Sequence, residues 1–140
     1  MYATISNDTF GGRYAFERAI SRAKRGRMMG LLTHSSRRLF SLEGYRNAGH
    51  SLGLVEVPID QICGTEGRQG DFDIDFNPLH KESRERWVGV FNAWMRGIAL
   101  GPIQLVKVGD IYYVRDGHHR ISVARALGLK YIDAEVVHQS

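Results

Sequence analysis

Residues 109–128 read GDIYYVRDGHHRISVARALG, and this stretch decides the fold. Its first half predicts a strand over 111–114, which Gly109-Asp110, a typical two-residue hairpin connection, joins to an earlier strand over 103–108. Its second half predicts a helix over 118–127, because apolar residues recur there at three- and four-residue spacing. The stretch is therefore predicted to form a strand, a sharp turn and a helix.

The turn between strand and helix carries the residues with the most chemistry. Gly117 lets the backbone turn sharply and approach a ligand, and the helix start offers unpaired amides and a positive dipole end. Arg120 can fork onto a phosphate, and Asp116 can orient His118 or His119, hold a metal or cap the helix. These residues predict a phosphate site with Asp116 and the two histidines as candidate catalytic groups. An ordinary turn followed by a helix cap explains the same residues equally well.

Periodicity outside this stretch predicts two more strands and three helices. The strands cover 54–58 and 132–137, and the helices cover 14–32, 39–48 and 79–98. The first dozen residues are predicted to be a loose tail that ends at Gly11-Gly12, and 64–70 a flexible polar loop. The helix over 79–98 presents a wide apolar face for a sheet to cover. The mixture of elements predicts a mixed α/β or α+β domain.

The stretch 109–128 resembles the strand–turn–helix signature of the ParB/sulfiredoxin superfamily. The preceding GIALGPI at 97–103 is similar to the segment that leads into this signature, and VPIDQI at 57–62 is similar to the usual first strand. The resemblance spans about residues 54–137. It implies an α+β fold of the ParB/sulfiredoxin kind, a mixed sheet with packed helices over 51–140. Residues 1–50 fall outside the resemblance, and their own pattern predicts a basic helical extension.

The resemblance also implies a ligand. In that superfamily the corresponding turn cradles nucleotide phosphates: CTP in ParB proteins, ATP in sulfiredoxins and ADP in a related kinase of free serine. It implies a pocket lined by Asp116, Gly117, His118, His119 and Arg120, with Pro102 and Ile103 on a second wall. We therefore expect binding of a nucleotide (ATP, ADP or CTP) or another phosphorylated ligand, with hydrolysis or phosphoryl transfer as a further step.

Three departures narrow these expectations. Sulfiredoxins carry a catalytic cysteine in this turn, whereas this chain has His118 there and its one cysteine, Cys63, lies far away in sequence, so sulfiredoxin activity is not expected. The arginine pair of ParB proteins is replaced by His119-Arg120, which leaves the preference for a triphosphate open. A downstream helix-turn-helix like that of ParB proteins does not follow residue 128, so partition-site recognition of that kind is not expected.

The stretch Asp71-Phe-Asp-Ile-Asp-Phe76 alternates strictly between carboxylates and apolar residues. As a functional element, Asp71, Asp73 and Asp75 are the candidate ligands of Mg²⁺ beside a phosphate. The plainer interpretation is the solvated face of an extended segment. Glu82 and Glu85, early in the helix over 79–98, are further candidate bases or metal ligands. Glu66 and Arg68 reach the pocket only if their loop folds over it.

Charge is unevenly spread along the chain. The net charge is +4, but residues 1–50 hold nine Lys/Arg against three acids, a local net charge of +6, and the remainder carries −2. Such a basic segment points to an anionic partner. A non-enzymatic DNA- or RNA-binding or regulatory module is therefore the alternative function. Its candidate contacts are Arg18, Arg22, Lys24, Arg25, Arg27, Arg37 and Arg38. A third interpretation of residues 1–50 is a homodimerisation arm or a cover for the edge of the sheet.

Composition sets the remaining bounds. The 140 residues fit one domain, and 43% hydrophobic residues supply one core. A single cysteine excludes an intramolecular disulfide framework and a cysteine metal cluster. The N-terminus lacks the pattern of a secretory signal, and no apolar run has the length of a membrane span. We expect a cytoplasmic protein.

Overall fold

The computed structural model describes residues 4–42 and 49–139, with side chains described from Gly11 onward. The elements in chain order are α1 (Thr4–Thr33), β1 (Phe40–Ser41), β2 (His50–Pro58), the 3₁₀ turn η1 (Ile59–Gln61), β3 (Ile62–Thr65), the 3₁₀ turn η2 (Lys81–Ser83), α2 (Arg84–Met95), β4 (Ile103–Val108), β5 (Ile111–Asp116), α3 (His118–Ala126) and β6 (Tyr131–Gln139). No helix within these described ranges has the length and apolar character to cross a membrane.

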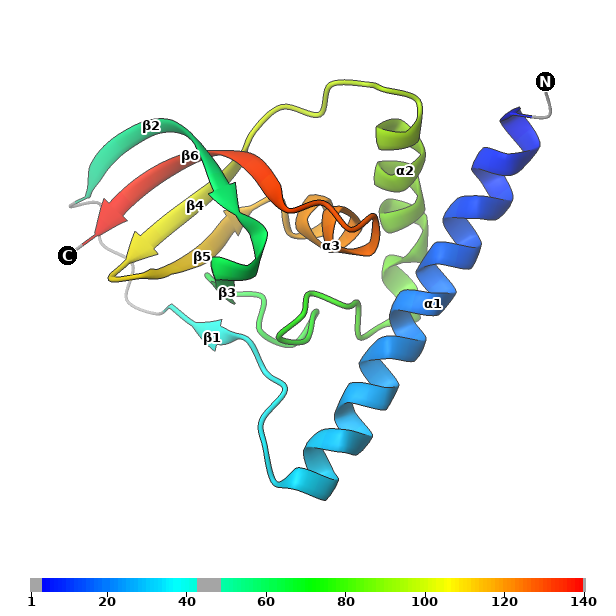
Figure 1. Cartoon of the computed structure of the whole chain (residues 1–140), viewed down its shortest axis with the longest axis horizontal. Helices are drawn as coiled ribbons and strands as arrows, with labels where there is room; N and C mark the ends of the chain where they lie inside the picture. Colours follow the sequence, from blue (N-terminus) through cyan, green and yellow to red (C-terminus); the bar gives the residue numbers. More distant parts are fainter. Residues whose placement is uncertain (1–3, 43–48, 140) are drawn as a thin grey trace.

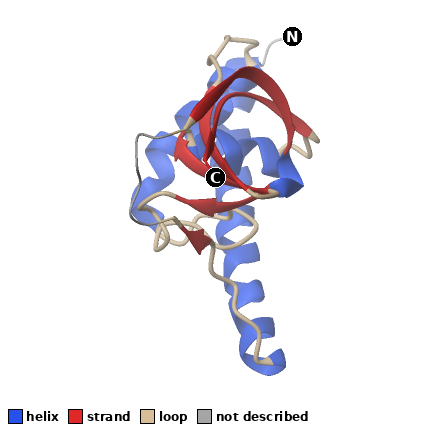
Figure 2. Cartoon of the chain, turned by 90° about the vertical axis from the view of Figure 1, so that its left-hand side faces the viewer, coloured by secondary structure: helices blue, strands red, loops and turns tan. Residues whose placement is uncertain are grey.

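The strands form one mixed sheet in the order β1-β3-β5-β4-β6-β2. The pairs β1–β3, β3–β5 and β4–β6 are parallel, whereas β4–β5 and β2–β6 are antiparallel. The three helices lie together at one end of the curved sheet, with α3 nearest the strands and α1 outermost (Figure 1). Seen from the side, the strands curl around the core (Figure 2). The α+β fold class with a mixed sheet and packed helices is confirmed.

The elements around the deciding stretch agree with the sequence analysis. β4 and β5 form the predicted hairpin, and Gly109 adopts the left-handed conformation, φ +60°, that the tight connection requires. α3 follows β5 directly and β6 closes the chain. β2 starts at His50, four residues before the predicted strand, and pairs with β6 along its length.

The prediction for the N-terminus is wrong in one respect. Residues 4–12 belong to α1 and do not form a loose tail. Gly12 is buried where α1 crosses α2, and a Cβ atom there would lie 2.8 Å from Val88 Cγ1. Gly12 therefore permits close helix packing, and the pair Gly11-Gly12 does not end the helix. The predicted apolar stripe of α1 is buried at Phe16, Ile20 and Ala23, but Leu31 is exposed.

Two predicted helices also need correction. The α-helix expected over 79–98 covers only Arg84–Met95, because the preceding residues are held in an extended bridge: Leu79 N donates to Asp71 O and Phe72 pairs with Pro78. The apolar face of α2 is covered mainly by α1 and α3, and Trp94 near its end also packs against the main core that contains the sheet residues. The short helix expected over 39–48 begins instead with β1, and residues 43–48 lie outside the described residues.

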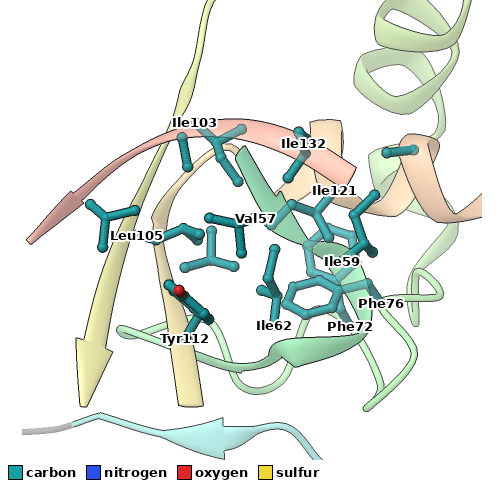
Figure 3. Packing of buried hydrophobic residues seen from close by; sticks show 14 of the residues in the cluster. Val57, Ile59, Ile62, Phe72, Phe76, Ile103, Leu105, Tyr112, Ile121 and Ile132 are labelled. Atoms are coloured by element: carbon teal, nitrogen blue, oxygen red, sulfur yellow. The ribbon is translucent and has the colours of Figure 1, made fainter. Parts of the chain in front are cut away.

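The main core lies between the sheet, α3 and the loop over 72–76. Figure 3 shows Ile103 and Leu105 of β4 facing Val57, Ile62 and the two rings Phe72 and Phe76. The two phenylalanines come from the acidic stretch, so its apolar half anchors the loop while its carboxylates face other partners. Ile121 of α3 reaches into the same cluster and ties the helix to the sheet.

A second core joins the three helices. Trp87 of α2 is fully buried, with its ring 5.6 Å from that of Phe16 in α1 and 5.8 Å from that of Phe91. Val123 of α3 completes the cluster. The Trp87 indole N–H donates to Ser122 Oγ at 2.8 Å, so this core contains a satisfied polar pair.

We expect Trp87→Phe to lower the free energy of unfolding by about 1–2 kcal/mol, measured by urea denaturation. The phenyl ring keeps most apolar contacts but removes the donor to Ser122 Oγ, a buried hydroxyl. Adding Ser122→Ala in the Trp87→Phe background should then cost little more, since the unpaired hydroxyl is also gone. A double variant whose loss equals the sum of the two single losses would contradict this pairing.

Candidate functional site

The turn from β5 into α3 is built around Gly117. It is the N-cap of α3 and adopts φ +108°, and a Cβ atom there would lie 2.4 Å from Ile103 Cγ2. No side chain caps the helix, and the first amide that pairs back into the helix is that of Ile121, to Gly117 O at 3.0 Å. The amides of the first turn are therefore left for another acceptor.

His118 is buried beneath this turn, 4% exposed. Its Nε2 lies 2.6 Å from Thr65 Oγ1 at the end of β3, and its ring stacks on Phe72 with a centroid separation of 6.0 Å. Burial lowers the pKa of His118 to about 4, with a smaller contribution from Arg68. The ring is therefore neutral near pH 7 and ties α3 to β3.

His119 differs from His118 in that one of its ring nitrogens has no hydrogen-bond partner. It is 7% exposed and meets the Phe72 ring edge-on at 5.3 Å, but its buried Nε2 has no hydrogen-bond partner. Burial lowers its pKa to about 4, and the charges of Arg68 and Arg86 act in the same direction. A neutral imidazole with a free ring nitrogen can donate or accept one hydrogen bond, so this position is prepared for a polar partner.

A cavity of about 330 Å³ opens beside His119. Its lining residues come from the loop after β3, from η2 and α2, and from α3: they are Arg68, Asp71, Phe72, His80, Glu82, Ser83, Arg86 and His119. Arg68 Nε pairs with Asp71 at 2.7 Å. Arg86 is exposed and forms no ion pair within the described part of the chain. The cavity thus combines two guanidinium groups, the carboxylates of Asp71 and Glu82, and a buried, unsatisfied ring nitrogen.

Arg120 does not reach this cavity. Its guanidinium donates to the carbonyls of Leu100, Gly101 and Pro102 at 3.1–3.2 Å and pairs with Asp116 at 3.2 Å. Arg120 and Pro102 instead line a separate cavity of about 480 Å³. Ile103 is fully buried in the main core. The structure therefore divides the expected binding residues between two sides of α3.

The three aspartates proposed as metal ligands do not share a site. Asp71 pairs with Arg68, and Asp75 pairs with Arg37 and, at 3.5 Å, with Arg125. Asp73 is 4% exposed and accepts from the amides of Asp75 and Asn77, so it shapes its own loop. Among residues 4–42 and 49–139, no group of three metal-ligating side chains is gathered. This set does not fit a shared Mg²⁺ ion.

The other candidates of the sequence analysis are dispersed. Glu82 lines the His119 cavity, whereas Glu85 faces a different hollow beside Arg13. Glu66 pairs with Arg115 at 3.2 Å, which leaves only Arg68 from its loop at the cavity. Cys63 lies in β3, its thiol pointing back to Asp60 O at 3.6 Å, and burial raises its pKa.

The basic residues proposed for nucleic-acid contact fall into two groups. Three of them bond within the molecule: Arg22 with Asn77, Arg37 with Asp75 and Arg38 with Gln69. The remaining four are exposed on α1: Arg18, Lys24, Arg25 and Arg27. A continuous band made by all seven is therefore not formed.

Arg86 is not among the residues predicted from the sequence. It lies in α2, thirty-three positions before His119, and only the packing of α2 against α3 brings the two residues to one cavity. The sequence contains only a weak indication that Arg86 is functional. Arg84 and Arg86 lie in the first turn of a helix, where the helix dipole does not stabilise cations, so their presence there calls for another reason.

Comparisons with known proteins found few similarities to this chain. No family model matches it, and no curated protein matches it. Among solved structures, it is similar to the crystal structure of sulfiredoxin from Arabidopsis thaliana, with 21% sequence identity and a TM-score of 0.47 over 61% of this chain and 85% of that one. At this identity and TM-score the similarity carries no conclusion about function.

Proposed function

We propose that the cavity beside His119 binds the phosphate groups of a nucleotide, with ATP, ADP and CTP as the candidate ligands. The observation that carries this proposal is the buried Nε2 atom of His119, which has no partner although its ring lines a cavity together with Arg68 and Arg86. Leaving such an atom unsatisfied costs roughly 1–3 kcal/mol, which a phosphate oxygen would recover.

The chemistry around the cavity suits an anion. Arg86 lacks an acidic partner among the described residues, and Arg68 uses only its Nε atom on Asp71. The uncapped start of α3 adds unpaired amides and the positive end of a helix dipole next to the same histidine. Guanidinium groups and helix amides are the donors that proteins direct at phosphate. A phosphate-bearing ligand is therefore favoured over an apolar one.

The lowered pKa of His119 fits a donor role. With a pKa of about 4 the ring is neutral near pH 7, and Arg68 and Arg86 contribute to that depression after burial. A bound phosphate would offset the two positive charges and raise the pKa of His119. Ligand binding should therefore become tighter as the pH falls from neutrality, as long as the protein stays folded.

Hydrolysis or phosphoryl transfer would need a base at the same cavity. Glu82 lines this cavity and is exposed, so it is able to accept a proton from an attacking hydroxyl or water while His119 donates to the phosphate. Release of inorganic phosphate from the bound nucleotide measures this step. Glu82→Gln should abolish that release while nucleotide binding remains.

Calorimetry with pyrophosphate, ATP, ADP, CTP and GTP, each with and without Mg²⁺, tests the binding proposal. We expect Arg86→Gln to weaken binding by roughly 10- to 100-fold, the equivalent of one charge-assisted hydrogen bond. Arg84→Gln is the matched control, because Arg84 begins the same helix but does not line this cavity. It removes the same charge and should change affinity by less than about twofold.

Two outcomes would overturn the proposal. One is the absence of heat with every nucleotide and with pyrophosphate. The other is an equal loss of affinity in Arg84→Gln and Arg86→Gln, which would show that binding depends on overall charge and not on this cavity.

A further inference from the structure

The last turns of α1 project away from the rest of the molecule. Figures 1 and 2 show the C-terminal half of this helix extending past α2 and α3, with its end standing clear of the sheet. From Ala23 to the end of the helix, the residues with the least exposure are small ones, Ala23, Gly26 and Gly30. The helix end is nevertheless held in place: the Arg37 side chain lies against Gly26 and Gly30 and pairs with Asp75.

Large apolar side chains cover the free side of this projection. Met28 is 65% exposed, Met29 57%, Leu31 74% and Leu32 74%. We call these four residues the apolar tip. Single exposed apolar residues are ordinary, but four within five consecutive positions form a patch, and such patches mark interaction sites.

The charges beside the apolar tip have one sign. Lys24, Arg25 and Arg27 are exposed on the turns just before it. From Arg18 to Leu42 the sequence contains no Asp or Glu. The nearest carboxylates from the elements packed against this half are already used, Asp75 by Arg37 and Asp73 by its own loop. The partner of this surface must therefore supply negative charge as well as an apolar environment.

A second copy of the chain and a nucleic acid would each match only one of the two properties of this surface, its apolar side chains or its positive charge. A second copy of the chain, joined tip to tip, would bring three cations of each protomer together without a neutralising group. A nucleic acid would satisfy the cations through its phosphates but would leave four large apolar side chains against a polar backbone. An anionic lipid surface supplies both requirements, because headgroups attract Lys and Arg while the acyl boundary accepts Met and Leu.

We propose that the end of α1 docks onto an anionic lipid membrane, with the apolar tip inserted into the interface and Lys24, Arg25 and Arg27 on the lipid headgroups. Met28 and Leu32 are four positions apart and share one helix face, so they enter together. The helix lies on the membrane and does not cross it. None of the four residues of the apolar tip lines the His119 cavity, which does not take part.

Co-sedimentation of the full chain with vesicles tests this proposal. We expect binding to vesicles made of equal parts phosphatidylglycerol and phosphatidylcholine, weakened by added salt, and at least about tenfold less binding to phosphatidylcholine alone. The double variant Met28→Gln/Leu32→Gln should lower partitioning onto the anionic vesicles by about tenfold or more. The matched control is Leu52→Gln/Leu54→Gln, two exposed leucines, 48% and 67%, on strand β2. This control should bind like the unmodified chain.

Three results would overturn the proposal. The first is the absence of binding to anionic vesicles, and the second is equal binding by the tip variant and the unmodified chain. The third is a concentration-dependent dimer, seen by analytical ultracentrifugation, that the tip variant abolishes while vesicle binding persists; a second copy would then cover the patch. Thermal unfolding checks that both double variants are folded, as expected for exposed positions.

Discussion

Gly117→Ala is expected to lower the free energy of unfolding by about 3 kcal/mol and to weaken nucleotide binding in the same variant. A Cβ atom at this position would lie 2.4 Å from Ile103 Cγ2 and 2.8 Å from Ile103 Cβ, both in the main core. The left-handed backbone, φ +108°, adds about 1–2 kcal/mol of strain for a residue with a side chain. Relief of the clash must move β4 or the start of α3, and the latter carries His119. Urea denaturation measures the stability loss.

Gly128→Ala separates the clash from the backbone strain. Gly128 ends α3 with φ +76° and has no atom within 4 Å of the position of a Cβ, so only the conformational penalty of about 1 kcal/mol applies. Ligand affinity should be unchanged in this variant, because the start of α3 is undisturbed. If both substitutions cost the same, the contact between Gly117 and Ile103 would not be what makes the glycine necessary.

The predictable elements of the fold are those whose structure is determined by residues close to one another in the sequence. The β4–β5 hairpin follows from Gly109-Asp110 between two apolar runs, and α3 follows from the spacing of Ile121, Val123, Ala124 and Leu127. β4 pairs with β5, the next element along the chain, and α3 begins two positions after β5 ends. Local periodicity and turn chemistry therefore contain most of the information that this part of the structure uses.

The strand β3 was not predictable in the same way. Ile62–Thr65 pairs in parallel with β1 and β5, whose residues come from before and far after it. Its Gly64, which suggests a flexible loop, is buried because the Tyr113 ring covers it; a Cβ would lie 2.2 Å from Tyr113 Cδ2. A glycine that makes room for an aromatic ring on the next strand looks identical in sequence to one that makes a loop.

The candidate site shows the same division. The sequence indicated that the turn at 116–120 was important and that its two histidines were candidate catalytic groups. The identity of the cationic groups was not predictable: Arg68 and Arg86 come from other segments, whereas Arg120 is engaged by three backbone carbonyls. Every residue has a backbone carbonyl, so the sequence does not show which carbonyls will accept hydrogen bonds from Arg120. That depends on the path of the loop over 96–102.

The second large effect is a loss of folding stability at acidic pH. Because the pKa of both His118 and His119 is lowered to about 4 in the folded protein, the unfolded chain takes up protons below about pH 6.5 that the folded chain does not. Stability therefore rises with pH across this window. Each histidine contributes a slope of up to about 1.4 kcal/mol per pH unit between roughly pH 6.5 and 4, and none above or below it. Urea denaturation at a series of pH values measures this slope.

His119→Phe should halve this slope and, near pH 7, leave the free protein at least as stable as before. The substitution removes a buried nitrogen that has no partner, and an apolar ring in its place keeps the contact with Phe72. The same variant should lose nucleotide binding. His119 would then be a residue that lowers the stability of the free protein but is needed to bind the ligand.

Two further substitutions show whether these effects belong to His119 in particular. His118→Phe differs, because it breaks the bond to Thr65 Oγ1 and should lower stability at pH 7 by about 1–2 kcal/mol. His50→Phe, at an exposed position, leaves both buried rings in place and controls for the loss of a histidine. A His119→Phe variant that is clearly destabilised at pH 7, or that still binds nucleotide with full affinity, would remove His119 from the proposed phosphate site.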